Sequence, residues 1–196
     1  MTMISAKPTL PEFPDFFETE RLLLRAPRAG DGRVVNDAIR ESHESLRPWM
    51  PWARTIPSVA ESETFAREGA LHFRIREELP LLLFRKSDGL FVGASGMHSI
   101  DWKVPRFEIG YWVRVGLAGQ GYITEAVRGI AQFAFARLGA VRLEIRCDAR
   151  NERSAAVALR AGFTFEARHH HDARDNDGDL RDTLVFVRFP DSPDEM

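Results

Sequence analysis

Glu108-Ile109-Gly110-Tyr111-Trp112-Val113 is followed, after a short loop, by Gly119-Gln120-Gly121-Tyr122 and Thr124-Glu125-Ala126-Val127. The first segment is typical of a strand, the glycines are typical of a turn, and the last segment is typical of a helix. Such a turn leaves several backbone N–H groups unpaired and directs them, with the positive end of the helix dipole, at one point. The pattern therefore predicts an anion site at the turn, and a phosphate is the anion that we expect there.

Downstream of this turn, the pattern continues as helix, strand, helix and two strands. Apolar residues at helical spacing predict a helix from Gly121 to Leu138, and Gly139 is a typical stop. Residues 142–148 alternate between apolar and charged side chains, which predicts a strand with an inner face of Leu143, Ile145 and Cys147. A helix over 151–161 and strands over 163–168 and 180–189 follow, with a polar loop between the two strands.

Upstream of the turn, a strand and two helices precede a run of strands. The pattern predicts a strand at 21–25, a helix at 30–47 that ends before Pro48, and a helix at 62–78 with Ser62 as its N-cap. A hairpin of strands 81–84 and 90–94 comes next, then the strand at 106–113. The order β-α-α-β-β-β-α-β-α-β-β predicts a mixed α/β sheet, in which the strands flanking the long helix run parallel.

Length and composition restrict the class of protein. A chain of 196 residues suits one domain, since domains typically have roughly 100–200 residues. A net charge of -2 does not mark a binder of nucleic acid or membrane surfaces, and no run of about 18 apolar residues is present. The single cysteine excludes an internal disulfide and fits a reducing compartment. We expect a cytoplasmic protein with an extended arm at 1–17, one domain at 18–190 and an acidic tail at 191–196.

Two well-known glycine signatures do not fit the turn. A dinucleotide-binding fingerprint needs a glycine three positions after Gly121, where this chain has Thr124. A nucleoside-triphosphate P-loop needs Gly-Lys-Ser/Thr, which the sequence lacks. The glycines alone are equally compatible with an ordinary tight turn.

The region from Arg106 to Phe165 resembles the acetyl-CoA-binding core of the GNAT acetyltransferase superfamily, in its RimJ/RimL-like branch. The motifs recur in order: the Glu-Ile-Gly-Tyr-Trp strand, the Gly-x-Gly-Tyr-x-Thr-Glu-Ala turn, Asn151 to Ser154, and Gly162-Phe163. The resemblance implies the GNAT fold, a mostly antiparallel sheet with a central pair of parallel strands that splay apart. The chain departs from the superfamily at Gly116, where Gln or Arg is common, which removes one side-chain contact but not the backbone cradle.

The resemblance also implies that acetyl-CoA is the co-substrate and that no metal is needed. The pyrophosphate is expected on the N–H groups around residues 117–122, and the pantetheine arm is expected along the strand at 112–113 like an added strand. The implied cofactor-binding residues are Trp112, Val113, Leu117, Ala118, Gly119, Gln120, Gly121, Tyr122 and Asn151. The N–H of Val113 is a candidate donor to the developing oxyanion.

Acyl transfer from a thioester to an amine needs a proton acceptor for the amine and a proton for the departing thiolate. Glu108 is our candidate base, although its carboxylate is also consistent with a solvent-facing position on a strand. Ser154 is our candidate acid, as its place in the RimL-like motif implies. Asn151 and Ser154 are equally consistent with the N-cap and N3 positions of a helix.

Two further segments bear on the amine acceptor. Arg47-Pro48-Trp49-Met50-Pro51-Trp52 places two tryptophans between the first two helices, either as a core plug or, as in related sequences, with Trp49 and Trp52 as walls of the substrate pocket. The polar loop at 169–179 carries three adjacent histidines and four aspartates. Their spacing does not fit a metal site, so we expect a solvated turn or an acidic patch that attracts a cationic amine.

These observations predict an N-acetyltransferase that moves an acetyl group from acetyl-CoA to a primary amine by direct attack in a ternary complex. The acceptor implied by the resemblance is a protein N-terminal amine, with a small-molecule amine and succinyl-CoA as open alternatives. A non-catalytic CoA-sensing or protein-interaction module, and a ribosome-associated adaptor, are the rival functions. We expect a homodimer, because exposed strand edges in this fold often pair.

Overall fold

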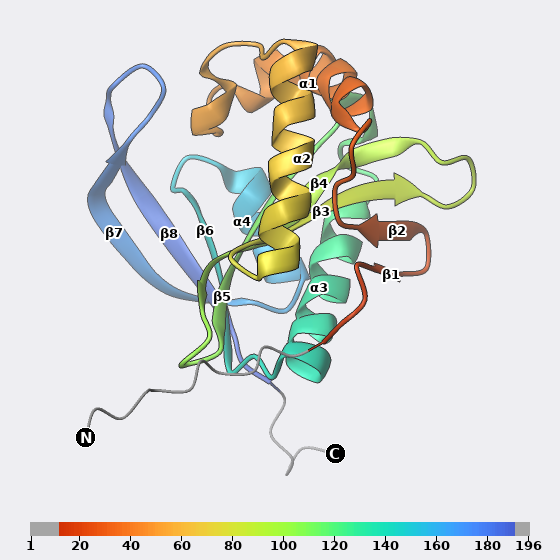
Figure 1. The fold of residues 1–196 in the computed structure, drawn as a ribbon. Helices are drawn as coiled ribbons and strands as arrows, with labels where there is room; N and C mark the ends of the chain where they lie inside the picture. The colour runs from red at the N-terminus through yellow and green to blue at the C-terminus, as the bar shows by residue number, and fades with distance from the viewer. Residues whose placement is uncertain (1–11, 191–196) are drawn as a thin grey trace, which may run out of the picture.

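The computed structural model describes residues 12–190, so the predictions for residues 1–11 and for the tail at 191–196 lie outside the described part. Figure 1 shows the elements, whose strands are β1 (Phe16–Glu18), β2 (Leu22–Arg25), β3 (Leu79–Arg85), β4 (Phe91–Asp101), β5 (Arg106–Val113), β6 (Arg142–Asp148), β7 (Thr164–Arg174) and β8 (Leu180–Arg188). The helices are α1 (Gly32–Leu46), α2 (Val59–Ile75), α3 (Tyr122–Leu138) and α4 (Glu152–Arg160), with short 3-10 helices η1 (Pro51–Arg54) and η2 (Val115–Leu117). Within residues 12–190, no helix has the length and apolar character needed to cross a bilayer.

The strands form one eight-stranded sheet in the order β1-β2-β3-β4-β5-β6-β8-β7. In the described part, every neighbouring pair is antiparallel except β5 and β6, which are parallel. The predicted mixed sheet with a central parallel pair is therefore confirmed. The edge strand β1 was not predicted, because its three residues are too few to show a period.

Helices cover both faces of this sheet (Figure 1). Helix α1 covers one face, where it packs against β3 and β4 through Val35, Ala38 and Ile39. The buried alanines and isoleucines of α3 pack on the opposite face, where Cys147 is also buried, as predicted. The site described below lies in the middle of the sheet, between these two layers.

The start of α2 differs from the prediction. The helix begins at Val59, and its N-cap is Ser58, whose hydroxyl accepts from the Glu61 N–H at 3.2 Å while the Glu61 carboxylate accepts from the Ser58 N–H. This reciprocal capping box satisfies two amides, which a cap at Ser62 does not do. Ser62 is instead buried, and its hydroxyl accepts from the side chain of Asn36.

The prediction of a long loop at 169–179 was wrong. Strand β7 continues to Arg174, and only residues 175–179 form the turn. The polar residues of this segment pair with β8 as far as Arg174 opposite Leu180, with a register shift between His169 and Ala173. An edge strand exposed to solvent can consist mainly of polar residues, so the composition of this segment did not indicate a strand.

Candidate active site

The site begins where β5 and β6 separate. These strands pair only over residues 106–108 of β5 and 142–144 of β6. Beyond that point, β5 remains paired with β4 as far as Val113, and β6 remains paired with β8 as far as Asp148. Beyond the paired residues, the backbone N–H and C=O groups on the facing edges of β5 and β6 therefore do not bond to each other. They can instead form hydrogen bonds with a ligand that carries amides.

The direction of the β5 amides follows from one hydrogen bond. The N–H of Arg114 donates to the Val92 carbonyl at 2.8 Å, so it faces β4. Because successive N–H groups of a strand point to opposite sides, the N–H of Val113 and that of Tyr111 face the gap toward β6. The predicted oxyanion donor at Val113 therefore has the required direction.

The glycine turn follows β5 and leads into α3. The amides of Leu117 and Ala118 already donate to Arg114 and Val115 within η2, at 2.9 and 3.2 Å. Gly119 and Gly121 have φ values of 77° and 81°, a backbone that side-chain-bearing residues rarely adopt. Within residues 12–190, the amides of residues 119–122 donate to no other described group. Of the N–H groups predicted at 117–122 to bind the pyrophosphate, those of residues 119–122, at the start of α3, therefore remain as candidates.

Contacts from both sides of the sheet hold this turn in place. The Val115 N–H donates to the Ser42 hydroxyl of α1 at 2.9 Å, and Arg114 forms an ion pair with Glu41 at 2.6 Å. The side chain of Tyr122 is buried in the core, so it offers only its backbone to a ligand at the turn. The Arg21 guanidinium covers the Tyr122 ring, with 4.4 Å between the guanidinium carbon and the ring centroid.

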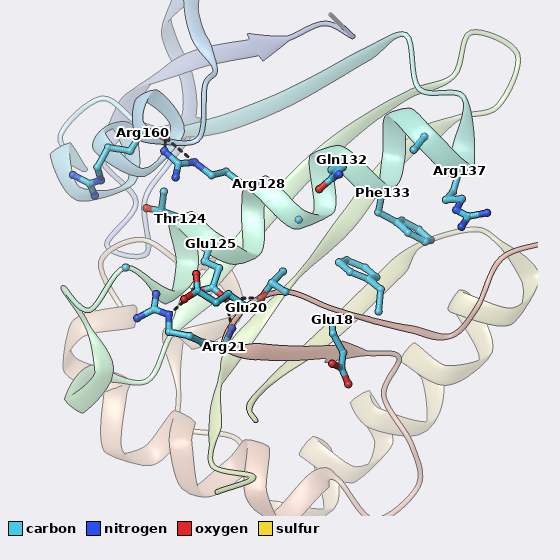
Figure 2. Close-up of a pocket in the computed structure, with 15 residues that line it drawn as sticks. Glu18, Glu20, Arg21, Thr124, Glu125, Arg128, Gln132, Phe133, Arg137 and Arg160 are labelled. Carbon is cyan, nitrogen blue, oxygen red and sulfur yellow. Dashed lines mark hydrogen bonds and ion pairs between the residues drawn. The ribbon is translucent and has the colours of Figure 1, made fainter. Parts of the chain in front are cut away.

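A pocket of about 1020 Å³ lies between residues 17–21 and the outer face of α3 (Figure 2). Gly121 and Thr124 form the end beside the turn, where Arg128 donates to the backbone carbonyl of Arg160. Figure 2 shows Arg137 at the other end of the pocket. None of these arginines was predicted as a site residue, because isolated arginines on helices have no local sequence signature.

Ser154 lies on the same face of the sheet as α3. The side chain of Asn151 caps α4 by accepting from the Ser154 N–H at 3.1 Å, so the structural role considered for Asn151 is confirmed. The Tyr111 hydroxyl lies 3.0 Å from both the Ser154 hydroxyl and the Ser154 carbonyl oxygen. Burial raises the pKa of Tyr111, so its hydroxyl stays protonated. Tyr111 is a residue of the candidate site that was not predicted from the sequence.

Glu108 lies on the other face of the sheet. It is three residues from Tyr111 on one strand, and side chains an odd number of residues apart point to opposite faces. His98 is paired with it across β4 and β5, with 4.0 Å between His98 Nε2 and Glu108 Oε1. The Ser99 hydroxyl lies 3.5 Å from the other carboxylate oxygen. The candidate base and the candidate acid thus flank the gap from opposite faces.

The structure brings Trp52 to the face that carries Glu108. Trp112 is four residues from Glu108 on β5 and so points to the same face. The Trp52 ring packs on Trp112 at 5.9 Å between centroids and is 46% exposed. Trp49 is half-buried and lies in the same short link. Trp52 is therefore a surface residue on the face that carries the candidate base, rather than a core plug.

The aspartates at 172–179 do not form the unpaired acidic patch that the sequence suggested. Asp172, Asp175 and Asp177 form ion pairs with Arg146, Arg150 and Arg47. Two of the neighbouring histidines lie beside aspartates, His170 at 3.0 Å from Asp182 and His169 at 3.6 Å from Asp172. In the described part of the chain, no group of three or more His, Cys, Asp or Glu side chains is arranged to hold a metal ion.

Comparison with known proteins agrees with this geometry. Residues 21–164 match the family model described as an acetyltransferase (GNAT) domain. The chain belongs to the GNAT acetyltransferase family. It is accordingly an acyl-CoA-dependent N-acyltransferase.

Two bacterial GNAT relatives cover most of the chain. The ribosomal-protein-serine acetyltransferase of Escherichia coli (strain K12) is 28% identical over 155 residues, which is 74% of this chain and 82% of that protein. YdaF of Bacillus subtilis (strain 168), whose name as a ribosomal N-acetyltransferase is provisional, is 28% identical over 151 residues, 76% of this chain and 81% of that protein.

Two solved GNAT structures show the same fold at lower identity. The ribosomal L7/L12 alpha-N-protein acetyltransferase RimL, in complex with coenzyme A, has a TM-score of 0.83 at 22% identity, covering 89% of this chain and 97% of RimL. The microcin C7 self-immunity acetyltransferase MccE, in complex with acetyl-CoA and AMP, has a TM-score of 0.83 at 22% identity, covering 91% and 98%.

Proposed function

We propose that this GNAT enzyme acetylates the N-terminal amine of a protein by direct attack in a ternary complex. The observation that carries the proposal is the gap between β5 and β6, with unpartnered amides at one end and Glu108 at its edge. The E. coli relative, 28% identical, is named for acetylation of a ribosomal-protein serine. A peptide with an N-terminal serine is therefore the first acceptor to test.

The residues present fit acetyl-CoA. The four amides at 119–122 and the positive end of α3 suit a pyrophosphate, and glycines at 119 and 121 leave the backbone open to close approach. The N–H groups of Tyr111 and Val113 suit the amides of a pantetheine arm. Asn151 lies on the far side of the gap at the start of α4.

Acetyl-CoA supplies the acetyl group as a thioester. Glu108 accepts a proton from the ammonium of the acceptor, which makes the amine nucleophilic. The N–H of Val113 donates to the carbonyl oxygen as negative charge develops there. As the C–N bond forms and the C–S bond breaks, Ser154 donates its hydroxyl proton to the sulfur. The second proton, which the nitrogen loses, returns through solvent to the Ser154 oxygen, so that the serine ends the reaction as a hydroxyl. Tyr111 orients the Ser154 hydroxyl by hydrogen bonding.

We further propose that the nucleotide end of acetyl-CoA lies in the pocket of Figure 2, where Arg160 adds positive charge beside the turn. Replacing Arg160 with alanine is expected to weaken acetyl-CoA about tenfold, because charge-assisted hydrogen bonds contribute roughly 1.5–3 kcal/mol. The loss should be small for 3′-dephospho-CoA, which lacks one phosphate. Arg137→Ala, at the other end of the pocket, is the matched control, and calorimetry measures each affinity.

The acetyltransferase activity itself is tested by mixing the protein with acetyl-CoA, a thiol reagent and a panel of peptides and small amines. We expect CoA release that depends on the serine peptide, with the acetyl group found by mass spectrometry on its α-amine. Binding of acetyl-CoA without release across the panel would favour the CoA-sensing alternative. Succinyl-CoA run in parallel tests the acyl donor.

A cytoplasmic location and a homodimer remain predictions. Sedimentation of the purified protein with and without acetyl-CoA tests the second. Co-sedimentation with ribosomes in the absence of acyl-CoA would instead favour the adaptor function.

A further inference from the structure

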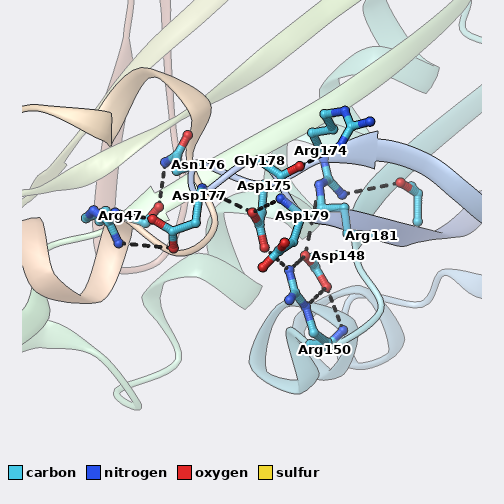
Figure 3. A network of polar contacts seen from close by, with 11 residues as sticks. Arg47, Asp148, Arg150, Arg174, Asp175, Asn176, Asp177, Gly178, Asp179 and Arg181 are labelled. Atoms are coloured by element: carbon cyan, nitrogen blue, oxygen red, sulfur yellow. Dashed lines mark hydrogen bonds and ion pairs between the residues drawn. The ribbon is translucent and has the colours of Figure 1, made fainter.

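The turn of the β7–β8 hairpin reaches back to a segment about 130 residues earlier in the chain (Figure 3). The Asn176 side-chain amide donates to the backbone carbonyls of Arg47 at 2.6 Å and Met50 at 2.9 Å. Arg54 donates to the Asn176 carbonyl at 2.9 Å, and Arg47 forms an ion pair with Asp177. We call these contacts the clasp.

The clasp supplies hydrogen-bond donors to backbone carbonyls of the segment that it holds. Arg47 is the C-cap of α1, and the last carbonyls of a helix lack partners within the helix. Pro48 and Pro51 have no N–H to donate in this link. The Asn176 amide supplies a donor for the Arg47 carbonyl and a second donor for that of Met50, which also accepts from Ala53. The clasp thereby fixes the backbone that carries Trp49 and Trp52.

The hairpin turn is hydrogen-bonded within itself and is anchored beside the cofactor side of the site. Asp175 accepts from the N–H groups of Asp177 and Asp179, at 3.1 and 3.0 Å. Arg150, the residue before the α4 N-cap, forms ion pairs with both Asp175 at 2.9 Å and Asp148 at 2.7 Å (Figure 3). The hairpin therefore connects the start of α4 to the tryptophan link on the opposite side of the site.

We propose that Asn176 is a positioning residue for the amine acceptor. Its two hydrogen bonds hold the link at 49–52 so that Trp52 stays packed on Trp112, on the face that carries Glu108. This inference rests on the proposed function. Asn176 would act on the acceptor side of the site by holding this link in place. It would touch neither acetyl-CoA nor the reacting atoms.

The test is a steady-state comparison of wild type with Asn176→Ala, using acetyl-CoA and a peptide with an N-terminal serine. The φ of Asn176 is not positive, so alanine can adopt its backbone. We expect the KM for the peptide to rise at least about fivefold, as the loss of two hydrogen bonds implies. The KM for acetyl-CoA should change less than about twofold, and tryptophan fluorescence should become easier to quench with acrylamide.

Asp179→Ala is the control, because it truncates a side chain of the same turn that forms no hydrogen bond or ion pair with another residue of 12–190, while the backbone bond to Asp175 stays in place. It should leave both KM values and the fluorescence unchanged. Arg54→Ala removes another hydrogen bond of the clasp and should also raise the peptide KM. This variant provides the test if Asn176→Ala folds poorly.

An unchanged peptide KM in folded Asn176→Ala, or an equal rise in both KM values, would overturn the positioning role. If Asn176→Ala does not fold, an unchanged peptide KM in Arg54→Ala overturns it. A wild-type enzyme that releases no CoA with any acceptor refutes the proposed function itself, and the positioning role with it.

Discussion

The Tyr111 hydroxyl and the Ser154 hydroxyl lie 3.0 Å apart, which joins the strand at the edge of the gap to the first turn of α4. A half-buried tyrosine that also contacts the Ser154 carbonyl keeps the serine side chain in one orientation. Ser154 is thereby presented to the place where we put the leaving sulfur.

Tyr111→Phe is expected to lower kcat about tenfold or more while leaving acetyl-CoA affinity nearly unchanged, because it frees the orientation of Ser154 without altering the turn at 119–122. Ser154→Ala should lower kcat at least as much. The double variant should be no worse than Ser154→Ala if the tyrosine acts through the serine. Single-turnover kinetics measure the chemical step, and additive losses would contradict this relationship.

Glu108→Gln is expected to lower kcat/KM at neutral pH by about 10²-fold or more, since general-base catalysis typically contributes 10²–10⁴-fold. Without an internal base, only amine that is already neutral in solution reacts. The rate should then rise with pH toward the ordinary α-amine pKa of about 7.7–8.0. Full activity with an unchanged pH profile would remove Glu108 from the mechanism. His98→Gln shows whether the neighbouring ring contributes to that profile.

Gly121→Ala is expected to weaken acetyl-CoA binding and to cost about 1–2 kcal/mol of stability, because the left-handed backbone is unfavourable for alanine. Its matched control is Gly139→Ala at the other end of α3, where φ is 65° and an added Cβ meets nothing within 4 Å. Both variants should lose similar thermal stability, and only the first should lose affinity in calorimetry. Equal affinities would argue against a phosphate at this turn.

Asp182 should make stability depend on pH in acid. Its carboxylate accepts from the His171 N–H and from Arg168, which lowers its pKa to about 2 from 3.8. A lowered folded-state pKa stabilises the protein above the ordinary value, and this stabilisation is lost as the pH falls through the folded value.

The difference in unfolding free energy between wild type and Asp182→Asn should therefore be full above about pH 4 and should shrink toward pH 2. Urea denaturation across this range measures it. Asp37→Asn, at an exposed position of α1, is the control substitution.

Elements with strong local signals were predicted closely. The bounds of β5 and β6 matched, and α3 began one residue from the expected position and ended at its glycine stop. The N-cap of α2 was predicted at Ser62, although Ser58 and Glu61 have the spacing of a capping box. The correct cap could therefore have been predicted from the sequence. The end of β7 carried no such signal, because an exposed edge strand can be composed like a loop.

The pattern of residues 106–138 was sufficient to predict the strand, the glycine turn and the helix, because each depends on periodicity, caps and glycine conformations within a few residues. The acetyl-CoA site at this turn, which the family resemblance implies, stays a prediction. The neighbours that complete the site depend on tertiary structure. A register shift between His98 and Asp101, where Ser99 has a φ of 51°, selects His98 as the partner of Glu108. Asn176 meets Arg47 only because the β7–β8 hairpin crosses to α1. Such pairings follow from strand register and packing, which one residue of bulge can change.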